Sequence, residues 1–265
     1  MHPPLQRPSA HRFDTIIRPI LKSAGQEAMS RFRQVGSTEK ADGSPVTEAD
    51  RAAEAVLVAG ISAAFPQDEV RSEEGSGQDG SRRCWYIDPI DGTSAFLEGL
   101  AYWGPTVGLV EGGVSRYGAL WLPRTGDYFH CEDGAAFLND VRLPPLVDVA
   151  PARRQVLYTP SRIHAHIRLD WPGKCRSLGS IAAHLCMVAA GSASAALIPS
   201  GWHAWDTAGG LALIQSVGAH AETLSGQPLD IERHAGQPFI AGLPSAIHWL
   251  RQPGRLSFLP LERSR

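Results

Sequence analysis

The segment WYIDPIDGTSAF holds two aspartates, Asp88 and Asp91, directly after a short apolar run. We expect that run to form a strand that delivers Asp88 at its carboxyl end, with Pro89 and Gly92 tightening the turn that follows. Two carboxylates presented at a strand end can share hard cations such as Mg²⁺, which prefers oxygen ligands. By itself, the same pattern also fits an ordinary turn rich in Asp, Pro and Gly.

The residues after Asp91 predict a phosphate site at the same turn. Thr93 is expected to open a short helical stretch, and the exposed amides of Gly92 and Thr93 would point toward the two carboxylates. Free N–H groups at a helix start bind phosphate readily. Metal ligands and amides on one turn are what the hydrolysis of a phosphate ester requires.

Two further acidic segments lie upstream. Glu73 and Glu74 end a short predicted strand, and since adjacent strand residues point to opposite faces, only one of them should face the site. Asp50 lies at the start of a predicted helix, where Thr47 three residues earlier resembles a capping box. A solvated acidic loop and a simple helix cap are the alternatives for these two segments.

Asp206 is the fourth acidic candidate, in the segment WDTAGG. It opens a predicted helix whose small residues permit close packing, and taken alone it is better explained as an N-cap. Spacing alone does not bring these acidic segments together.

The surrounding pattern predicts the elements that would position these residues. Apolar residues at three-to-four spacing indicate a helix of about 20 residues from Phe13, which Pro19 can kink, and a second helix over 47–64. Further helices are expected over 178–190 and 206–217. Strands are expected over 69–72, 84–87, 106–110, 117–122, 127–131, 155–159, 193–198, 220–224 and 239–241.

The order of these elements predicts two halves. A Pro-rich stretch, LPPLVDVAPARR, marks a boundary near residue 148. We expect residues 1–147 to form an α+β half with most of the metal ligands, and residues 148–265 to form an α/β half that carries Asp206 and a substrate-side loop.

Composition argues against several other classes of protein. The chain has 265 residues and a formal net charge of −2, and its Lys and Arg residues are scattered, which gives no sign of a nucleic-acid partner. No apolar run approaches the roughly 20 residues that span a bilayer. The N-terminus lacks the apolar core of a signal peptide, so we expect a cytoplasmic protein. The four cysteines are then expected to be reduced.

Together, the segments KADGSPVTEAD, SEEG, DPIDGTSAF and WDTAGG, in this order, resemble the lithium-sensitive inositol monophosphatase family. The helix RSLGSIAAHLCMVAAG and the turn SGQPL extend the resemblance over about residues 13–242. The resemblance implies a layered αβαβα sandwich of the inositol monophosphatase/fructose-1,6-bisphosphatase type, and usually a homodimer. It also implies two or three Mg²⁺ ions per active site and a small phosphate ester as substrate.

The resemblance further implies a role for each candidate residue. One Mg²⁺ would be held by Glu73, Asp88 and the Ile90 carbonyl, and a second by Asp88, Asp91 and Asp206. Glu73 would help a third through water. Thr93 and Asp50 would orient the water that attacks phosphorus, with no covalent phosphoenzyme. Asp91, Ser180 and Asp206 would contact the substrate, and Lys40 resembles a basic loop residue near the site.

Two departures from the family pattern leave the substrate open. Relatives that act on inositol phosphate carry a glutamate seven residues before the WD aspartate, where this chain has Pro199. DGT is followed by SAFLEG, where inositol phosphatases usually show an asparagine and a histidine. An inositol 1-phosphate-like ester is the first expectation. Histidinol phosphate and a 3′(2′),5′-bisphosphate nucleotide are alternative substrates, and a regulatory binding protein of the same fold is an alternative of another class.

Overall fold

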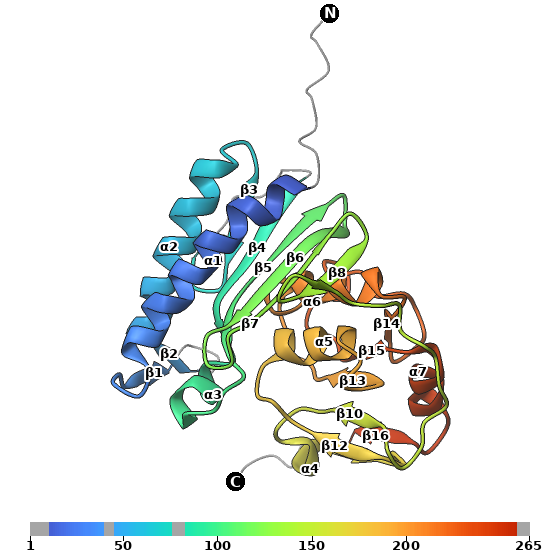
Figure 1. The fold of residues 1–265 in the computed structure, drawn as a ribbon. Coiled ribbons are helices and arrows are strands. Elements are labelled where there is room, and N and C mark those ends of the chain that lie inside the picture. The colour runs from blue at the N-terminus through green and yellow to red at the C-terminus, as the bar shows by residue number, and fades with distance from the viewer. Residues whose placement is uncertain (1–10, 40–44, 76–82, 259–265) are drawn as a thin grey trace, which may run out of the picture.

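The computed structural model describes residues 11–39, 45–75 and 83–258. Its first layer consists of two helices, α1 (His11–Arg31) and α2 (Glu48–Ala64), which pack side by side on one face of a large sheet (Figure 1). Both helices bury apolar residues at three-to-four spacing, as the sequence predicts. The helix α1 continues through Pro19 to its end at Arg31.

The large sheet has the strand order β3-β4-β5-β6-β7-β8-β9. Its strands are β3 (Glu69–Ser72), β4 (Arg83–Asp91), β5 (Gly104–Glu111), β6 (Val114–Leu122), β7 (Asp127–Glu132), β8 (Ala135–Leu138) and β9 (Val141–Arg142). The first pair, β3 and β4, is parallel, and the later pairs are antiparallel. Successive hairpins explain the antiparallel pairs, since short turns can join only antiparallel neighbours.

The strand β4 differs from the prediction. It does not end at Ile87 but runs on through Asp88 to Asp91, with a shift in its register against β5 between the two aspartates. The turn therefore falls at Gly92, and the short helix α3 (Thr93–Glu98) begins at Thr93 as expected.

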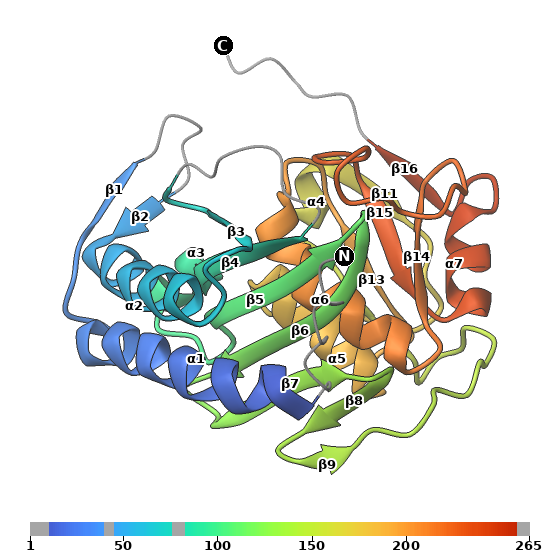
Figure 2. The same ribbon diagram turned by 90° about the horizontal axis from the view of Figure 1, so that it is seen from above.

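Two helices form the middle layer, on the opposite face of the large sheet: α5 (Ile181–Ala189) and α6 (Ala204–Ser216). Both begin at positions other than those predicted. The cap of α5 is Ser180, so the residues 178–180 precede the helix, and α6 begins two residues before Asp206. Figure 2 shows β5 and β6 between α1 and α6.

A smaller sheet lies beyond the middle layer, with the order β12-β10-β13-β15-β14. Its strands are β10 (Val156–Tyr158), β12 (Lys174–Arg176), β13 (Ala195–Ile198), β14 (His220–Thr223) and β15 (Phe239–Gly242). The three strands β12, β10 and β13 are mutually parallel, whereas β15 is antiparallel to β13 and β14. The helix α7 (Pro244–Arg251) packs against β15 as the outermost layer.

The five layers confirm the αβαβα sandwich. Separate clusters of buried apolar side chains fill the spaces between α1/α2 and the large sheet, around α5 and α6, and between the small sheet and α7. Several peripheral elements were not predicted: β1 (Ser37–Glu39), β2 (Pro45–Thr47), α4 (Ile163–His166), β11 (Ile167–Leu169) and β16 (Leu256–Phe258), together with β8, β9, β12 and α7. The segment around residue 148 joins the two sheets, and a division of the chain into two domains there stays a prediction.

Candidate active site

Three aspartates from two layers meet at one point. Asp88 and Asp91 lie on β4, and Asp206 lies in the first turn of α6; one carboxylate oxygen from each lies within 4.8 Å of the others. In a regular strand, residues three apart would point to opposite faces. The register shift between Asp88 and Asp91 removes that alternation, so both side chains reach the same site. Pro89 lies inside this irregular stretch, where the loss of a ladder hydrogen bond is tolerated.

A backbone N–H fixes one oxygen of each of these carboxylates. The donors are Ile90 N to Asp88 Oδ1 at 2.9 Å, Ala182 N to Asp91 Oδ2 at 2.5 Å, and His203 N to Asp206 Oδ2 at 2.7 Å. Bonds from an amide to a carboxylate are short, strong and directional. Each acid is thus held in place through at least one of its oxygens.

Asp91 also connects the two sequence halves. Ser180 caps α5 and donates from Oγ to Asp91 Oδ2 at 2.5 Å, while the same Oγ accepts from Ala183 N at 2.9 Å. Gly92 permits this approach, because it has a φ of 93° and a Cβ there would lie 3.1 Å from both Gly179 O and Ser180 Cβ. Ser180 therefore lies beside the acidic cluster with its hydroxyl on Asp91, and its contact with the substrate stays a prediction.

Close packing of α6 on the large sheet carries Asp206 to β4. A Cβ on Gly209 would lie 2.5 Å from Val107 O, and one on Gly118 would lie 2.1 Å from Gly209 O. Only hydrogen fits at these positions, so the helix axis lies closer to the strands than larger residues would allow. This confirms the close packing expected from the small residues after Asp206.

The cluster of carboxylates is electrostatically unfavourable without a cation. Burial raises the pKa of Asp88 well above its usual value, and the charges of Glu73, Asp91 and Asp206 raise it further. Burial raises the pKa of Asp91 to about 6, although Ser180 and Ala182 favour its ionised form. Burial and the charge of Asp91 also raise the pKa of Asp206. Within the part of the chain that the structure describes, no ion pair involves these three aspartates.

The donor set fits a divalent cation. Several carboxylate oxygens converge, and a bound metal ion would offset their mutual repulsion. An all-oxygen set matches hard ions such as Mg²⁺ or Ca²⁺ rather than metals that prefer thiolate or imidazole ligands.

Glu73 lies immediately after β3, where its N–H donates to Ile87 O on the neighbouring β4 at 3.2 Å. It is outside the group of three oxygens, yet its negative charge raises the pKa of Asp88, Asp91 and Asp206. Its role as a metal ligand stays a prediction, as does that of the Ile90 carbonyl.

Thr93 and Asp50 lie together beside the cluster. Thr93 Oγ1 lies 3.3 Å from Asp50 Oδ1 and 3.2 Å from Ile90 O, so its single proton can be donated to either. Asp50 is fully buried, and its Oδ2 accepts from Thr47 N at 2.8 Å and from Thr47 Oγ1 at 2.6 Å. Burial raises the pKa of Asp50 to about 6. The predicted capping box at Thr47 is confirmed, and it holds Asp50 toward Thr93.

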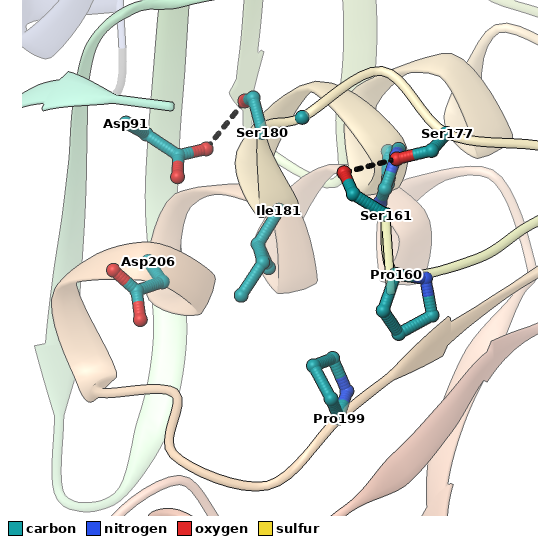
Figure 3. Close-up of a pocket in the computed structure, with 10 residues that line it drawn as sticks. Asp91, Pro160, Ser161, Ser177, Ser180, Ile181, Pro199 and Asp206 are labelled. Atoms are coloured by element: carbon teal, nitrogen blue, oxygen red, sulfur yellow. Dashed lines mark hydrogen bonds between the residues drawn. The ribbon is translucent and has the colours of Figure 1, made fainter. Parts of the chain in front are cut away.

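A cavity of about 250 Å³ opens beside Asp91 and Asp206 (Figure 3). Asp91 and Asp206 lie on one side of it, and Pro160, Ser161 and Ser177 lie across from them. The full lining is Asp91, Pro160, Ser161, Ser177, Gly179, Ser180, Ile181, His184, Pro199 and Asp206. Pro199, the position at which the sequence departs from inositol phosphatases, therefore borders the cavity.

Most residues on the side of the cavity opposite Asp91 and Asp206 were not identified from the sequence. Pro160, Ser161, Ser177 and His184 were not singled out because none of them is acidic, although Ser177 and His184 lie in the segment RSLGSIAAHLCMVAAG. The one available signal was His184, a polar residue inside the apolar run IAAHLCMVA. Lys40 lies outside the described residues.

Fold and site define a layered α/β protein with a buried cluster of carboxylates beside a small cavity. A model of the inositol monophosphatase family matches residues 10–246. The chain belongs to this family, whose members hydrolyse phosphate monoesters and depend on metal ions.

Individual relatives carry different names. The chain is 32% identical over 212 residues to the histidinol-phosphatase of Chlorobaculum parvum, which covers 75% of this chain and 81% of the relative. It is 29% identical over 224 residues to the 3′(2′),5′-bisphosphate nucleotidase CysQ of Shigella flexneri, covering 80% of this chain and 90% of the relative. The solved structure of the Thermotoga maritima IMPase aligns with a TM-score of 0.77 at 28% identity, over 90% of this chain and 94% of that chain.

Proposed function

We propose that this chain is a Mg²⁺-dependent phosphatase that hydrolyses a small phosphate monoester by direct attack of water. The observation that carries the proposal is the group of three carboxylates within 4.8 Å of one another, beside a cavity and without a described ion pair. Asp88, Asp91 and Asp206 would hold the ions together with Glu73 and the Ile90 carbonyl. Bound Mg²⁺ would supply Lewis-acid chemistry, which lowers the pKa of water, binds phosphate oxygens and stabilises the leaving alkoxide.

In this proposal, Thr93 and Asp50 orient the attacking water. Thr93 Oγ1 would accept a hydrogen bond from the water and pass its own proton toward Asp50 Oδ1, at 3.3 Å. The amides of Gly92 and Thr93 at the start of α3 would donate to phosphate oxygens. Ser180 fixes Asp91 at 2.5 Å, which keeps that carboxylate aligned between the metal site and the cavity.

For the substrate, an inositol 1-phosphate-like ester is our first choice, and the cavity next to Asp91 and Asp206 would hold its alcohol portion. Histidinol phosphate and a 3′(2′),5′-bisphosphate nucleotide are the alternatives, which the names of the two relatives support.

The deciding experiment is the release of inorganic phosphate by the purified chain. We expect turnover with Mg²⁺ on at least one of inositol 1-phosphate, histidinol phosphate, adenosine 3′,5′-bisphosphate and fructose 1,6-bisphosphate, and none in excess EDTA. Full activity in EDTA, or no turnover of any ester with Mg²⁺, would contradict the proposal.

Three finer properties belong to the same proposal: the chain forms a homodimer, it is inhibited by millimolar Li⁺, and it is located in the cytoplasm. A homodimer is tested by sedimentation velocity, inhibition by millimolar Li⁺ by the phosphate assay, and a cytoplasmic location by cell fractionation. None of the described helices is long and apolar enough to cross a membrane.

A further inference from the structure

The wall of the cavity that faces the carboxylates is built at the ends of three parallel strands. Pro160 and Ser161 follow β10, Ser177 follows β12 directly, and Pro199 follows β13 directly. In open α/β sheets, ligands bind outside the carboxyl ends of such strands. This wall is therefore where the alcohol portion of a substrate would lie, if the proposed phosphatase function holds.

Hydroxyl groups form the outer part of this wall. Ser161 Oγ and Ser177 Oγ lie 2.9 Å apart and both border the cavity (Figure 3). Each hydroxyl can both donate and accept, so the pair suits a ligand that does the same. Among the described residues that line the cavity, none is Lys or Arg, and the acidic ones are Asp91 and Asp206.

His184 supplies a directed donor deeper in the wall. Its ring is 4% exposed, stacks on Tyr158 with centroids 5.1 Å apart, and borders the cavity. Its Nε2 accepts a hydrogen bond from Leu178 N at 2.9 Å, so the proton of the neutral ring is on Nδ1. Among the described residues, no hydrogen bond involves Nδ1. Nδ1 is also not one of the buried polar atoms that lack a partner, so it is accessible, and a ligand in the cavity can accept its hydrogen bond.

His184 is also electrically neutral. Burial lowers the pKa of its ring to about 4, so the ring carries no charge at neutral pH. A second phosphate on the alcohol portion would thus enter a cavity whose described lining offers it no cationic side chain.

We propose that His184 is a specificity-determining residue, whose Nδ1–H donates to a hydroxyl oxygen of the alcohol portion. With Ser161 and Ser177, it selects phosphate monoesters of uncharged, hydroxylated alcohols over esters whose alcohol carries a second phosphate. The inference rests on the proposed function and adds the chemical class of the leaving alcohol.

Two substitutions of His184 distinguish the donor at Nδ1 from the hydrogen bond that Nε2 accepts from Leu178 N. In His184→Gln, the side-chain oxygen can reach the place of Nε2 and still accept from Leu178 N, but no donor remains at the place of Nδ1. In His184→Asn, the amide nitrogen can take the place of Nδ1, but the acceptor for Leu178 N is lost. Both remove the stack on Tyr158, so that loss is common to the pair.

Kinetics with fructose 1-phosphate and thermal unfolding are measured for both variants. We expect His184→Gln to raise KM about three- to tenfold, with kcat changed by less than about twofold. His184→Asn should keep a KM closer to that of wild type and have the lower melting temperature of the two. The role of Nδ1 would be overturned if His184→Gln had the same KM as wild type. It would also be overturned if the variant with the lower melting temperature had the higher KM.

The charge selection is tested with a matched substrate pair on the wild-type chain. Fructose 1-phosphate and fructose 1,6-bisphosphate share the ester at C1 and differ in the second phosphate, which would enter the cavity. We expect kcat/KM to be about tenfold or more higher for fructose 1-phosphate. An equal or higher value for the bisphosphate would overturn the inference while leaving the phosphatase function intact. Absence of phosphate release from every ester would overturn the function itself and this inference with it.

Discussion

At the scale of single residues, the site combines acids that repel one another with backbone amides that hold them in place. Asp88 is 2% exposed and Asp91 5%, so their repulsion is poorly screened. The amides of Ile90 and Ala182 fix one oxygen of each before any ligand binds. Such fixed groups need little rearrangement when a ligand arrives, which is the property that metal and phosphate sites require.

Replacement of Asp88 should abolish most of the activity and leave the chain folded. In Asp88→Asn, an amide nitrogen replaces one possible ligand oxygen and a negative charge is lost, so we expect activity below about a tenth of wild type. Because the substitution also reduces repulsion among buried carboxylates, circular dichroism should show a folded chain. The matched control is Asp133→Asn, the same change at an exposed position, which should leave activity unchanged. A folded Asp88→Asn protein with substantial activity would exclude Asp88 as a central ligand.

Pro199 bears on the choice among polyols. A site built to pair substrate hydroxyls rejects analogues strongly, because its own polar groups would be left unsatisfied, and a proline side chain has no such group. We therefore expect no strong preference for inositol 1-phosphate over glycerol 2-phosphate in a competition assay. Pro199→Glu should shift the ratio toward inositol 1-phosphate. A wild-type preference above about a hundredfold would show that another residue of this loop makes the contact.

His184 should make folding stability depend on pH. Its pKa is about 4 in the folded chain, against an ordinary value of 6.5, so below pH 6.5 the unfolded state binds a proton that the folded state excludes. Stability is therefore lost as pH falls from 6.5 toward 4, by about 2 kcal/mol at pH 5. Urea unfolding at pH 7 and pH 5 should show a larger loss for wild type than for His184→Gln. Equal losses in the two proteins would contradict a neutral buried His184.

At the scale of elements, the approach of α6 to the large sheet decides where Asp206 lies. Gly118 on β6 and Gly209 on α6 allow backbone to touch backbone, as the 2.1 Å gap for an added Cβ shows. Interiors are packed too densely to absorb an extra methyl group there without a shift. Helix position and metal-site geometry are therefore coupled.

Gly209→Ala tests that coupling. The added Cβ would lie 2.5 Å from Val107 O, so we expect a loss of about 1–3 kcal/mol in unfolding free energy. Displacement of α6 should also weaken Mg²⁺ binding, measured by calorimetry on the folded variant. Gly36→Ala is the control, because a Cβ there meets nothing within 4 Å, and it should change stability by less than about 0.5 kcal/mol. Unchanged Mg²⁺ affinity in Gly209→Ala would show that the packing of α6 does not determine the geometry of the metal site.

At the scale of the whole molecule, the site lies where the large sheet meets the middle layer. The large sheet supplies Asp88 and Asp91, α6 supplies Asp206, and the cap of α5 supplies Ser180. A ligand that binds this junction stabilises the folded chain relative to the unfolded one, since the unfolded chain lacks the site. Metal binding should therefore be visible in global stability.

Removal of divalent metal should lower the melting temperature. We expect Mg²⁺ to raise it above the value in EDTA, and Ca²⁺ to raise it as well while supporting less activity, because Ca²⁺ prefers more ligands at longer distances. Differential scanning fluorimetry and phosphate release are measured on the same samples. The Asp88→Asn variant should show a smaller Mg²⁺ shift than wild type. A melting temperature that is the same with Mg²⁺, with Ca²⁺ and in EDTA would argue against a metal site at this junction.

The sequence by itself determined the local features of this protein. Three-to-four spacing identified α1 and α2, and short strand-like segments separated by turn residues identified β3, β5, β6, β7 and the start of β4, because these patterns depend on neighbours along the chain. Thr47 and Asp50 formed the predicted capping box for the same reason. The acidic motifs, through their family resemblance, indicated the candidate ligands and the layered fold.

Only the tertiary structure decided how those pieces meet. The register shift that turns Asp88 and Asp91 to one site depends on how β4 pairs with β5, which no local pattern encodes. The hydroxyl pair Ser161–Ser177 and the free donor of His184 come from segments far from the acidic motifs, brought to the cavity by the parallel order of β12, β10 and β13. Strand order and helix position are set by packing over the whole chain, so the wall that faces the substrate could be recognised only once the layers were assembled.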